Sequence, residues 1–288
     1  MLRDVTSPTP DGVVVALEGV SKAFGDLVVL DGLDLEVRQG ESMVVIGGSG
    51  SGKSVMLKHV IALLRPDAGR IRVDGVDLAS LSGRELTHFR RRFGMAFQEG
   101  ALFDSMTVAE NVGFSLRRLT DLSAAEIRER VEECLRLVRL EGTGDKLPAE
   151  LSGGMRRRVG FARAIAHEPE ILLFDEPTTG LDPVITALVD EVILDLTEGL
   201  DTTAITITHD MTSAFRIADR IGLLWGGRIV ALASPEEFRE LDDSRVQQFI
   251  HGRAEGPLTD PRELPGGSAE PVKDPRAAGR VSREESER

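Results

Sequence analysis

The octapeptide Gly47-Gly48-Ser49-Gly50-Ser51-Gly52-Lys53-Ser54 fits the phosphate-loop pattern G-x-x-x-x-G-K-[ST] at every fixed position. The apolar run 43–46 before it predicts a buried strand, and residues 55–64 after it predict a helix that Pro66 stops. Glycines let the backbone wrap around a phosphate chain, and free N–H groups at the helix N-terminus point at the anion. Lys53 would then reach the β- and γ-phosphates, and the Ser54 hydroxyl would bind Mg²⁺. The alternative, a Gly/Ser turn with a chance lysine, is disfavoured by the flanking strand and helix.

The composition limits the function classes that need to be considered. The chain has 288 residues, of which 41% are hydrophobic, enough for one large domain or two small ones. It contains neither a run of ~20 apolar residues nor an apolar N-terminal signal region, so we expect a cytoplasmic protein whose membrane role requires partner chains. The single Cys134 agrees with a reducing compartment. A net charge of −13 and an aromatic content of 4% argue against a nucleic-acid binder.

The order of predicted elements indicates an α/β fold. Residues 13–17 read as a strand, and the apolar runs 27–30 and 33–37 flank Asp31-Gly32, which predicts a hairpin and hence an N-terminal antiparallel sheet. Strands and helices alternate after the phosphate loop, so the core sheet should be mostly parallel. The ends, residues 1–12 and 257–288, are polar and are expected to be flexible and disordered.

Residues 99–160 are expected to form a helical insert. Thr107 with Glu110, and Ser123 with Glu126, have the spacing of capping boxes that start helices. The second helix carries an apolar stripe that includes Cys134, which is therefore interpreted as a packing residue.

A second acidic motif, Asp175-Glu176, follows the apolar run 171–174. Ligands bind at the carboxyl ends of parallel strands, so Asp175 would face the Mg²⁺ of the nucleotide. Glu176, one residue further on, could take a proton from an attacking water. The alternative is an acidic strand end that merely meets solvent.

These motifs occur with others in the order found in ABC-transporter ATPases. The additional matches are Gln98, Leu151-Ser152-Gly153-Gly154-Met155, Leu181-Asp182 and His209. Residues 13–235 therefore resemble that family. The resemblance implies a P-loop NTPase (ABC ATPase) fold with an N-terminal antiparallel β subdomain and an inserted α-helical subdomain, and it implies ATP and Mg²⁺ as cofactors.

The resemblance also assigns site residues within one protomer. The nucleotide contacts of the phosphate loop extend to Val55. Phe24, which by itself reads equally as a partly buried hydrophobe or as an adenine-stacking ring, corresponds to the adenine-stacking aromatic. Gln98 corresponds to the residue that contacts Mg²⁺ and the attacking water, and His209 to the one that contacts the γ-phosphate.

Other residues of the family pattern act across a homodimer that encloses two ATP. Ser152, Gly153 and Gly154 would bind the γ-phosphate held by the other protomer, and Asp182 would lie along the interface. The consecutive Arg156, Arg157 and Arg158 cannot share one helix face, so we expect a mostly solvated role for them.

Two stretches are similar to the ATPases of Mce/Mla-type lipid transporters: Gly100-Ala101-Leu102-Phe103 and residues 243–257. This similarity implies a peripheral protein at the cytoplasmic face of the inner membrane. It also implies a C-terminal extension, residues 235–256, that contacts the other protomer. The implied partners are a permease facing residues 100–106, a Mce-domain substrate-binding protein and a STAS-like regulator on the helical insert. The alternatives are a generic small-solute importer, a soluble ABC ATPase acting on DNA or the ribosome, and a subunit that binds ATP without hydrolysing it.

Overall fold

The computed structural model describes residues 12–260, which divide into two compact units between Asp242 and Asp243. The predicted flexible ends, 1–12 and 257–288, lie outside the described residues except for Gly12 and residues 257–260. The predicted extension 235–256 spans the division. Its first helix, α9 (Pro235–Glu240), belongs to the first unit, and its second, α10 (Ser244–His251), belongs to the second.

The first unit begins with the expected antiparallel sheet, whose strands have the order β2-β1-β4-β5. Its strands are β1 (Val13–Phe24), β2 (Leu27–Arg38), β4 (Ala68–Val73) and β5 (Val76–Asp77). Along β2 the inward side chains Leu33, Leu35 and Val37 are buried and alternate with exposed ones. This sheet therefore presents one apolar face to the core.

The hairpin predicted at Asp31-Gly32 is wrong, because β2 runs through both residues and the chain instead reverses between Phe24 and Leu27. Gly32 has a φ of +66° and donates its N–H to Ser21 Oγ at 2.8 Å. The register of the two strands shifts nearby, so the Asp-Gly pair forms an irregularity within a strand.

The second sheet has six strands in the order β10-β9-β3-β8-β7-β6. They are β3 (Ser42–Ile46), β6 (Phe93–Ala96), β7 (Ile171–Asp175), β8 (Thr203–Thr208), β9 (Arg220–Trp225) and β10 (Arg228–Ala233). All pairs are parallel except β9 with β10, which confirms the mostly parallel core sheet. The carboxyl ends of β3, β7 and β8 consequently meet at one edge of the sheet.

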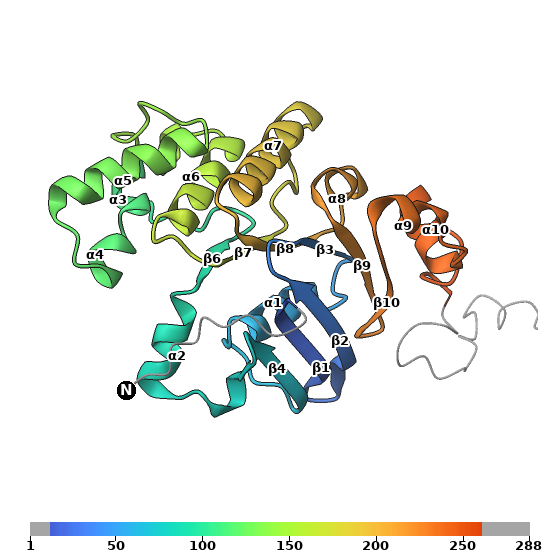
Figure 1. The fold of residues 1–288 in the computed structure, drawn as a ribbon. Helices are drawn as coiled ribbons and strands as arrows, with labels where there is room; N and C mark the ends of the chain where they lie inside the picture. Colours follow the sequence, from blue (N-terminus) through green and yellow to red (C-terminus); the bar gives the residue numbers. More distant parts are fainter. Residues whose placement is uncertain (1–11, 261–288) are drawn as a thin grey trace, which may run out of the picture. The chain divides into compact units, whose positions relative to one another are not determined.

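Helices cover both faces of this sheet (Figure 1). Helix α1 (Lys53–Val60) lies on one face, and α6 (Gly153–Ile165), α7 (Pro183–Gly199) and α8 (Met211–Ile217) lie on the other (Figure 1). The first unit also contains α2 (Gly83–Arg90), α3 (Val108–Val112), α4 (Leu116–Leu119) and α5 (Ala124–Leu137), with 3₁₀ turns at Leu78–Ser80 and Pro148–Glu150. Helix α1 lies between the two sheets, where Met56, Leu57 and Val60 join a core built from both. Within residues 12–260, no helix is both long and apolar enough to span a bilayer.

The helices α3 and α5 begin where the capping pattern predicts. Thr107 Oγ1 accepts a hydrogen bond from the N–H of Glu110 at 3.2 Å, and Glu110 Oε2 accepts one from the N–H of Thr107 at 2.8 Å. Ser123 and Glu126 form the same reciprocal pair at α5. Cys134 is fully buried on the apolar side of α5, in agreement with a packing role.

Candidate nucleotide site

The glycine-rich loop lies between the carboxyl end of β3 and the start of α1. A Cβ on Gly47 would lie 2.7 Å from the carbonyl oxygen of Leu224, and a Cβ on Gly52, where φ is +103°, would lie 3.0 Å from that of Val29. Gly48 and Gly50 have open space on the corresponding side. The loop is thus packed tightly at its two ends, and its middle remains free to face an anion.

Lys53 lies under this loop and is almost completely buried. Its Nζ donates to the carbonyl oxygens of Gly47 at 2.7 Å and Gly48 at 3.1 Å. The Nζ is also 3.4 Å from Glu176 Oε1. A buried ammonium group fixed beside the loop provides a positive charge where a phosphate chain would lie.

Ser54 and Asp175 bring two oxygen ligands together at the sheet edge. Ser54 Oγ donates to Asp175 Oδ1 at 3.2 Å. Burial raises the pKa of Asp175, while the hydrogen bond from Ser54 acts in the opposite direction. Across residues 12–260 no cluster of three or more His, Cys, Asp or Glu is suited to a metal ion. This sparse donor set fits Mg²⁺, which in nucleotide sites takes one or two protein oxygens together with phosphates and waters.

Glu176 directly follows β7 and has an unusual backbone conformation, with a φ of +50°. Its N–H donates to the carbonyl oxygen of Ile207 at 2.9 Å. Its Oε2 accepts from Thr179 Oγ1 at 2.9 Å and is 2.8 Å from His209 Nδ1. A left-handed conformation is strained for a residue other than glycine, so these contacts must hold it. The structure therefore brings the predicted catalytic residues Lys53, Glu176 and His209 together.

Phe24 and Gln98 lie in exposed positions at strand ends. Phe24 is the last residue of β1, its side chain is 47% exposed, and Lys22 Nζ lies 5.5 Å from its ring centroid. An exposed ring at this position favours the stacking interpretation over the packing one. Gln98 follows β6 with an exposed side chain, and its backbone carbonyl accepts from Arg157 Nε.

The motif at residues 152–154 forms the N-terminus of α6. Ser152 is the N-cap and its Oγ accepts from the N–H of Met155 at 3.3 Å. Gly154 is buried against α7, since a Cβ there would lie 2.4 Å from Ile185 Cγ2. Asp182 caps α7 by accepting from the N–H groups of Val184 and Ile185 at 3.0 and 3.1 Å. Within one protomer, this motif therefore contacts the segment around Asp182.

The prediction of a mostly solvated role is wrong for Arg157 and Arg158, which are each only 8% exposed. Arg157 Nε donates to the carbonyl oxygen of Gln98 at 2.7 Å, and its Nη2 donates to that of Thr179. Arg158 Nη1 donates at 2.9 Å to the carbonyl of Val138, at the end of α5. Burial lowers the pKa of both guanidinium groups. Sequence reasoning missed them because their partners are backbone carbonyls on distant segments.

Two further residues outside the predicted set hold the segment 100–106. Arg163 on α6 donates to the carbonyl oxygens of Gly100 and Ala101, each at 2.8 Å. Asn111 on α3 is fully buried; it accepts from the N–H of Phe103 at 2.8 Å and donates to the carbonyl oxygens of residues 103, 106 and 107. An asparagine that satisfies four backbone groups gives this exposed segment a fixed shape.

Comparison with known proteins identifies relatives over most of the chain. The ABC transporter family matches residues 30–179. A probable ribonucleotide transport ATP-binding protein, mkl, of Mycobacterium leprae is 42% identical over 249 residues, which are 86% of this chain and 72% of that protein. The intermembrane phospholipid transport system ATP-binding protein MlaF of Haemophilus influenzae is 40% identical over 245 residues, 85% and 93% of the two chains. A dimeric post-hydrolysis structure of the ATP-binding cassette MJ0796 with ADP and Pi has a TM-score of 0.70 at 33% identity, covering 77% of this chain and 98% of that one.

Proposed function

The chain belongs to the ABC transporter family of ATPases, and we propose that it is the ATP-hydrolysing subunit of a transporter for phospholipids or related lipids. The observation that carries the catalytic part is the contact of Glu176 with both Lys53 and His209 beside the glycine-rich loop. The lipid part is supported by the relatedness to MlaF and by the Gly100–Phe103 stretch, although the related mkl carries a different substrate in its name.

In the proposed mechanism, Lys53 and the N–H groups of the loop bind the β- and γ-phosphates. Glu176 Oε2 is the general base that accepts the proton of the attacking water, and His209, which contacts that oxygen, holds the carboxylate in line. Ser54 and Asp175 would hold Mg²⁺, which neutralises the charge that develops on the phosphates.

Two protomers would enclose two ATP. The N-terminus of the 13-residue helix α6 would bind an anion through its free N–H groups. Ser152 is exposed there and Gly153 is partly exposed. The dimeric state of the structurally similar cassette MJ0796 supports a head-to-tail dimer, in which this site and Asp182 face the nucleotide of the other protomer. Phe24 would stack on the adenine.

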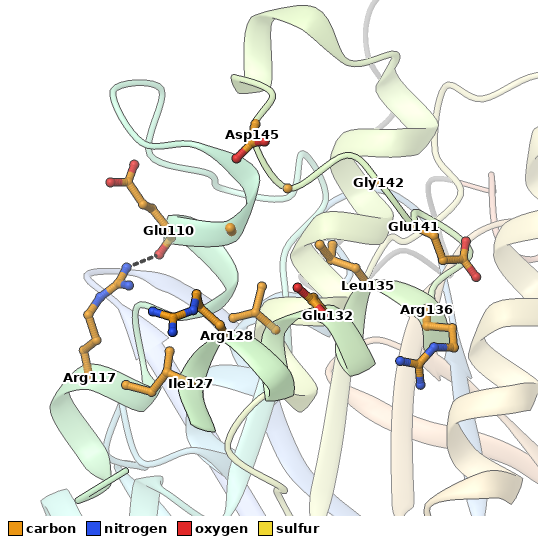
Figure 2. A pocket seen from close by; sticks show the side chains of 13 residues that line it. Glu110, Arg117, Ile127, Arg128, Glu132, Leu135, Arg136, Glu141, Gly142 and Asp145 are labelled. Carbon is orange, nitrogen blue, oxygen red and sulfur yellow. Dashed lines mark hydrogen bonds between the residues drawn. The ribbon is translucent and has the colours of Figure 1, made fainter. Parts of the chain in front are cut away.

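The permease would bind at residues 100–106, where Phe103 is exposed and its ring packs 4.7 Å from that of Phe114. A Mce-domain protein would bind the lipid substrate, and the complex would place this chain at the cytoplasmic face of the inner membrane. A STAS-like regulator would bind the helical region, where a hollow of about 570 Å³ lies between α3, α5 and the loop at residues 141–145. Figure 2 shows the side chains that line it. The rim of this hollow carries both acidic and basic side chains, among them Arg128 and Glu132, and so suits a polar protein surface.

The catalytic proposal is tested with Glu176→Gln, which keeps the shape of the side chain but removes the base. We expect retained ATP binding, accumulation of an ATP-bound dimer in size-exclusion chromatography, and loss of steady-state phosphate release. Glu191→Gln, on the exposed side of α7, is the matched control. Turnover of Glu176→Gln near the unmutated rate would exclude Glu176 as the base.

The transport proposal is tested by co-purification from a membrane extract, followed by identification of the bound chains and lipids. Recovery of a permease with phospholipid supports the assignment. Recovery of a sugar or amino-acid permease would overturn the lipid assignment and leave the ATPase assignment intact. Asp104→Lys combined with Phe103→Ala should abolish the association with the permease, whereas Asp121→Lys, an exposed control elsewhere on the helical region, should not.

A further inference from the structure

Asp190, in the middle of α7, is a charged residue with no role in the mechanism above. It is 0% exposed, and its Oδ1 has no hydrogen-bond partner among the described residues. Its Oδ2 accepts from Arg216 Nη1 at 2.9 Å and is 3.1 Å from Ser213 Oγ, both on α8. Burial raises the pKa of Asp190 to about 6. A buried carboxylate with incomplete partners is costly, so its presence needs an explanation beyond helix packing.

The hydrogen bonds of Asp190 continue to the loop that carries Glu176. Ser213 Oγ is 3.3 Å from Thr178 Oγ1, and both hydroxyls are buried. The next residue, Thr179, donates from its hydroxyl to Glu176 Oε2. The carboxylate on α7 thus fixes Ser213, Ser213 fixes Thr178, and Thr178 sets the position of the residue that contacts the general base.

The same hydrogen bonds hold the helix that follows His209. Asp210 caps α8 by accepting from the N–H groups of Thr212 and Ser213 at 2.8 and 3.2 Å. Ser213 therefore lies in the first turn of α8, four residues after His209. The hydrogen bond to Asp190 attaches Ser213, and with it α8, to the longer helix α7. This attachment fixes His209 relative to Glu176, whose strained backbone must be held in place by surrounding contacts.

We propose that Asp190 is a positioning residue for ATP hydrolysis, which through Ser213 keeps Glu176 and His209 in mutual register. This inference rests on the proposed roles of Glu176 and His209. Asp190 contacts neither the glycine-rich loop nor Lys53, so its removal should impair the hydrolytic step and spare nucleotide binding. Displacements of about 1 Å at a reacting group can cost about 100-fold in rate.

The test measures kcat and KM for ATP, together with the single-turnover rate of phosphate formation, in five variants, of which the fifth is Asp190→Asn. Asp190→Ala and Ser213→Ala should each lower kcat and the single-turnover rate at least 10-fold, with KM changed less than 2-fold. The double variant should be no slower than Asp190→Ala, because both changes interrupt one series of contacts. Asp195→Ala removes an exposed carboxylate of the same helix and should change kcat less than 2-fold.

The outcomes separate this inference from a purely structural role and from the catalytic proposal. The side chain of Asp190→Asn can still accept a hydrogen bond from Ser213. A kcat of this variant within about 3-fold of the unmutated rate supports positioning by Asp190. If folded Ser213→Ala keeps its full rate, or if KM rises as much as kcat falls, positioning by Asp190 is excluded. If Glu176→Gln keeps its turnover, the catalytic assignment itself fails, whatever the Asp190 variants show.

Discussion

Gly154 provides a quantitative test of the packing between α6 and the first turn of α7. A Cβ at this position would lie 2.4 Å from Ile185 Cγ2, far inside the ~3.5–4.0 Å optimum for two carbon atoms. Ile185 cannot easily rotate away, because a β-branched side chain in a helix has one strongly preferred χ1. Gly154→Ala therefore overpacks the contact, at a typical cost of about 1–3 kcal/mol.

Helix propensity acts in the opposite direction, since alanine is preferred to glycine in a helix by roughly 0.5–1 kcal/mol. We expect Gly154→Ala alone to lower the free energy of unfolding by about 0.5–2 kcal/mol. In an Ile185→Leu background the side chain has a single γ carbon, which can point away from residue 154. There the alanine should be neutral or stabilising by up to about 1 kcal/mol. Ile185→Val retains Cγ2 and is the matched control, in which the full penalty should persist.

The assay is urea unfolding of the nucleotide-free protein, followed by far-UV circular dichroism. The six proteins required are the unmutated chain, three single variants and the two double variants with Gly154→Ala. The Leu cycle should give a coupling energy of about 1–2 kcal/mol and the Val cycle a much smaller one. If the Leu cycle is additive within ~0.5 kcal/mol, the packing argument is refuted.

Three other expectations concern titratable groups. Burial raises the pKa of the Cys134 thiol to about 11. A disulfide reagent should therefore modify Cys134 at least about 100-fold more slowly in the native protein than in urea. Equal rates in the two conditions would contradict its burial. Arg245 lowers the pKa of Asp243 to about 2, below its ordinary 3.8, so this carboxylate stabilises α10 above about pH 4 and less as the pH falls through 2. The protection factors of the α10 amides, which correct for the intrinsic pH dependence of hydrogen exchange, should therefore fall on acidification, and Asp243→Asn should weaken that fall. Arg220→Met leaves the buried Glu41 carboxylate without its cation, so it should lower the free energy of unfolding by about 3–5 kcal/mol. Urea unfolding measures this loss, and a loss below ~1 kcal/mol would contradict the prediction.

The sequence predicts the parts of the site whose conformation and chemistry are both local. Glycines at fixed spacing specify the backbone of the phosphate loop, and Lys53 and Ser54 follow directly. Asp175 and Glu176 are aligned with the loop because β7 and β3 are parallel strands of one sheet, each paired with β8. The alternation of strands and helices was sufficient to infer that arrangement.

Residues with distant backbone partners could not be predicted in this way. Arg157 donates to a carbonyl 59 positions earlier, and neither its side chain nor its neighbours indicate that partner. At Asp31-Gly32 the local turn signal was overruled by tertiary contacts. The N–H of Asp31 donates to the carbonyl oxygen of Gly227 in the β9–β10 turn, and its carboxylate pairs with Arg228. The residues around Asp31 thus pair with β1 on one side and with the β9–β10 turn on the other, which favours a continuous strand β2 over a turn.

Helix α6 links the candidate sites that lie outside the glycine-rich loop. Its N-terminus carries Ser152, its Arg157 holds the backbone of both Gln98 and Thr179, and its Arg163 holds the segment proposed to face the permease. Displacing the helix would leave the guanidinium groups of Arg157 and Arg163 without their acceptors, so we expect the helix and the segments that it holds to move together. We therefore expect a force applied at Gly100 to be transmitted to Thr179, beside the proposed general base, through backbone carbonyls. Arg157 contacts the backbone carbonyl of Gln98 and not its side chain, so we expect changing the Gln98 side chain and changing Arg157 to disturb separable properties of the protein.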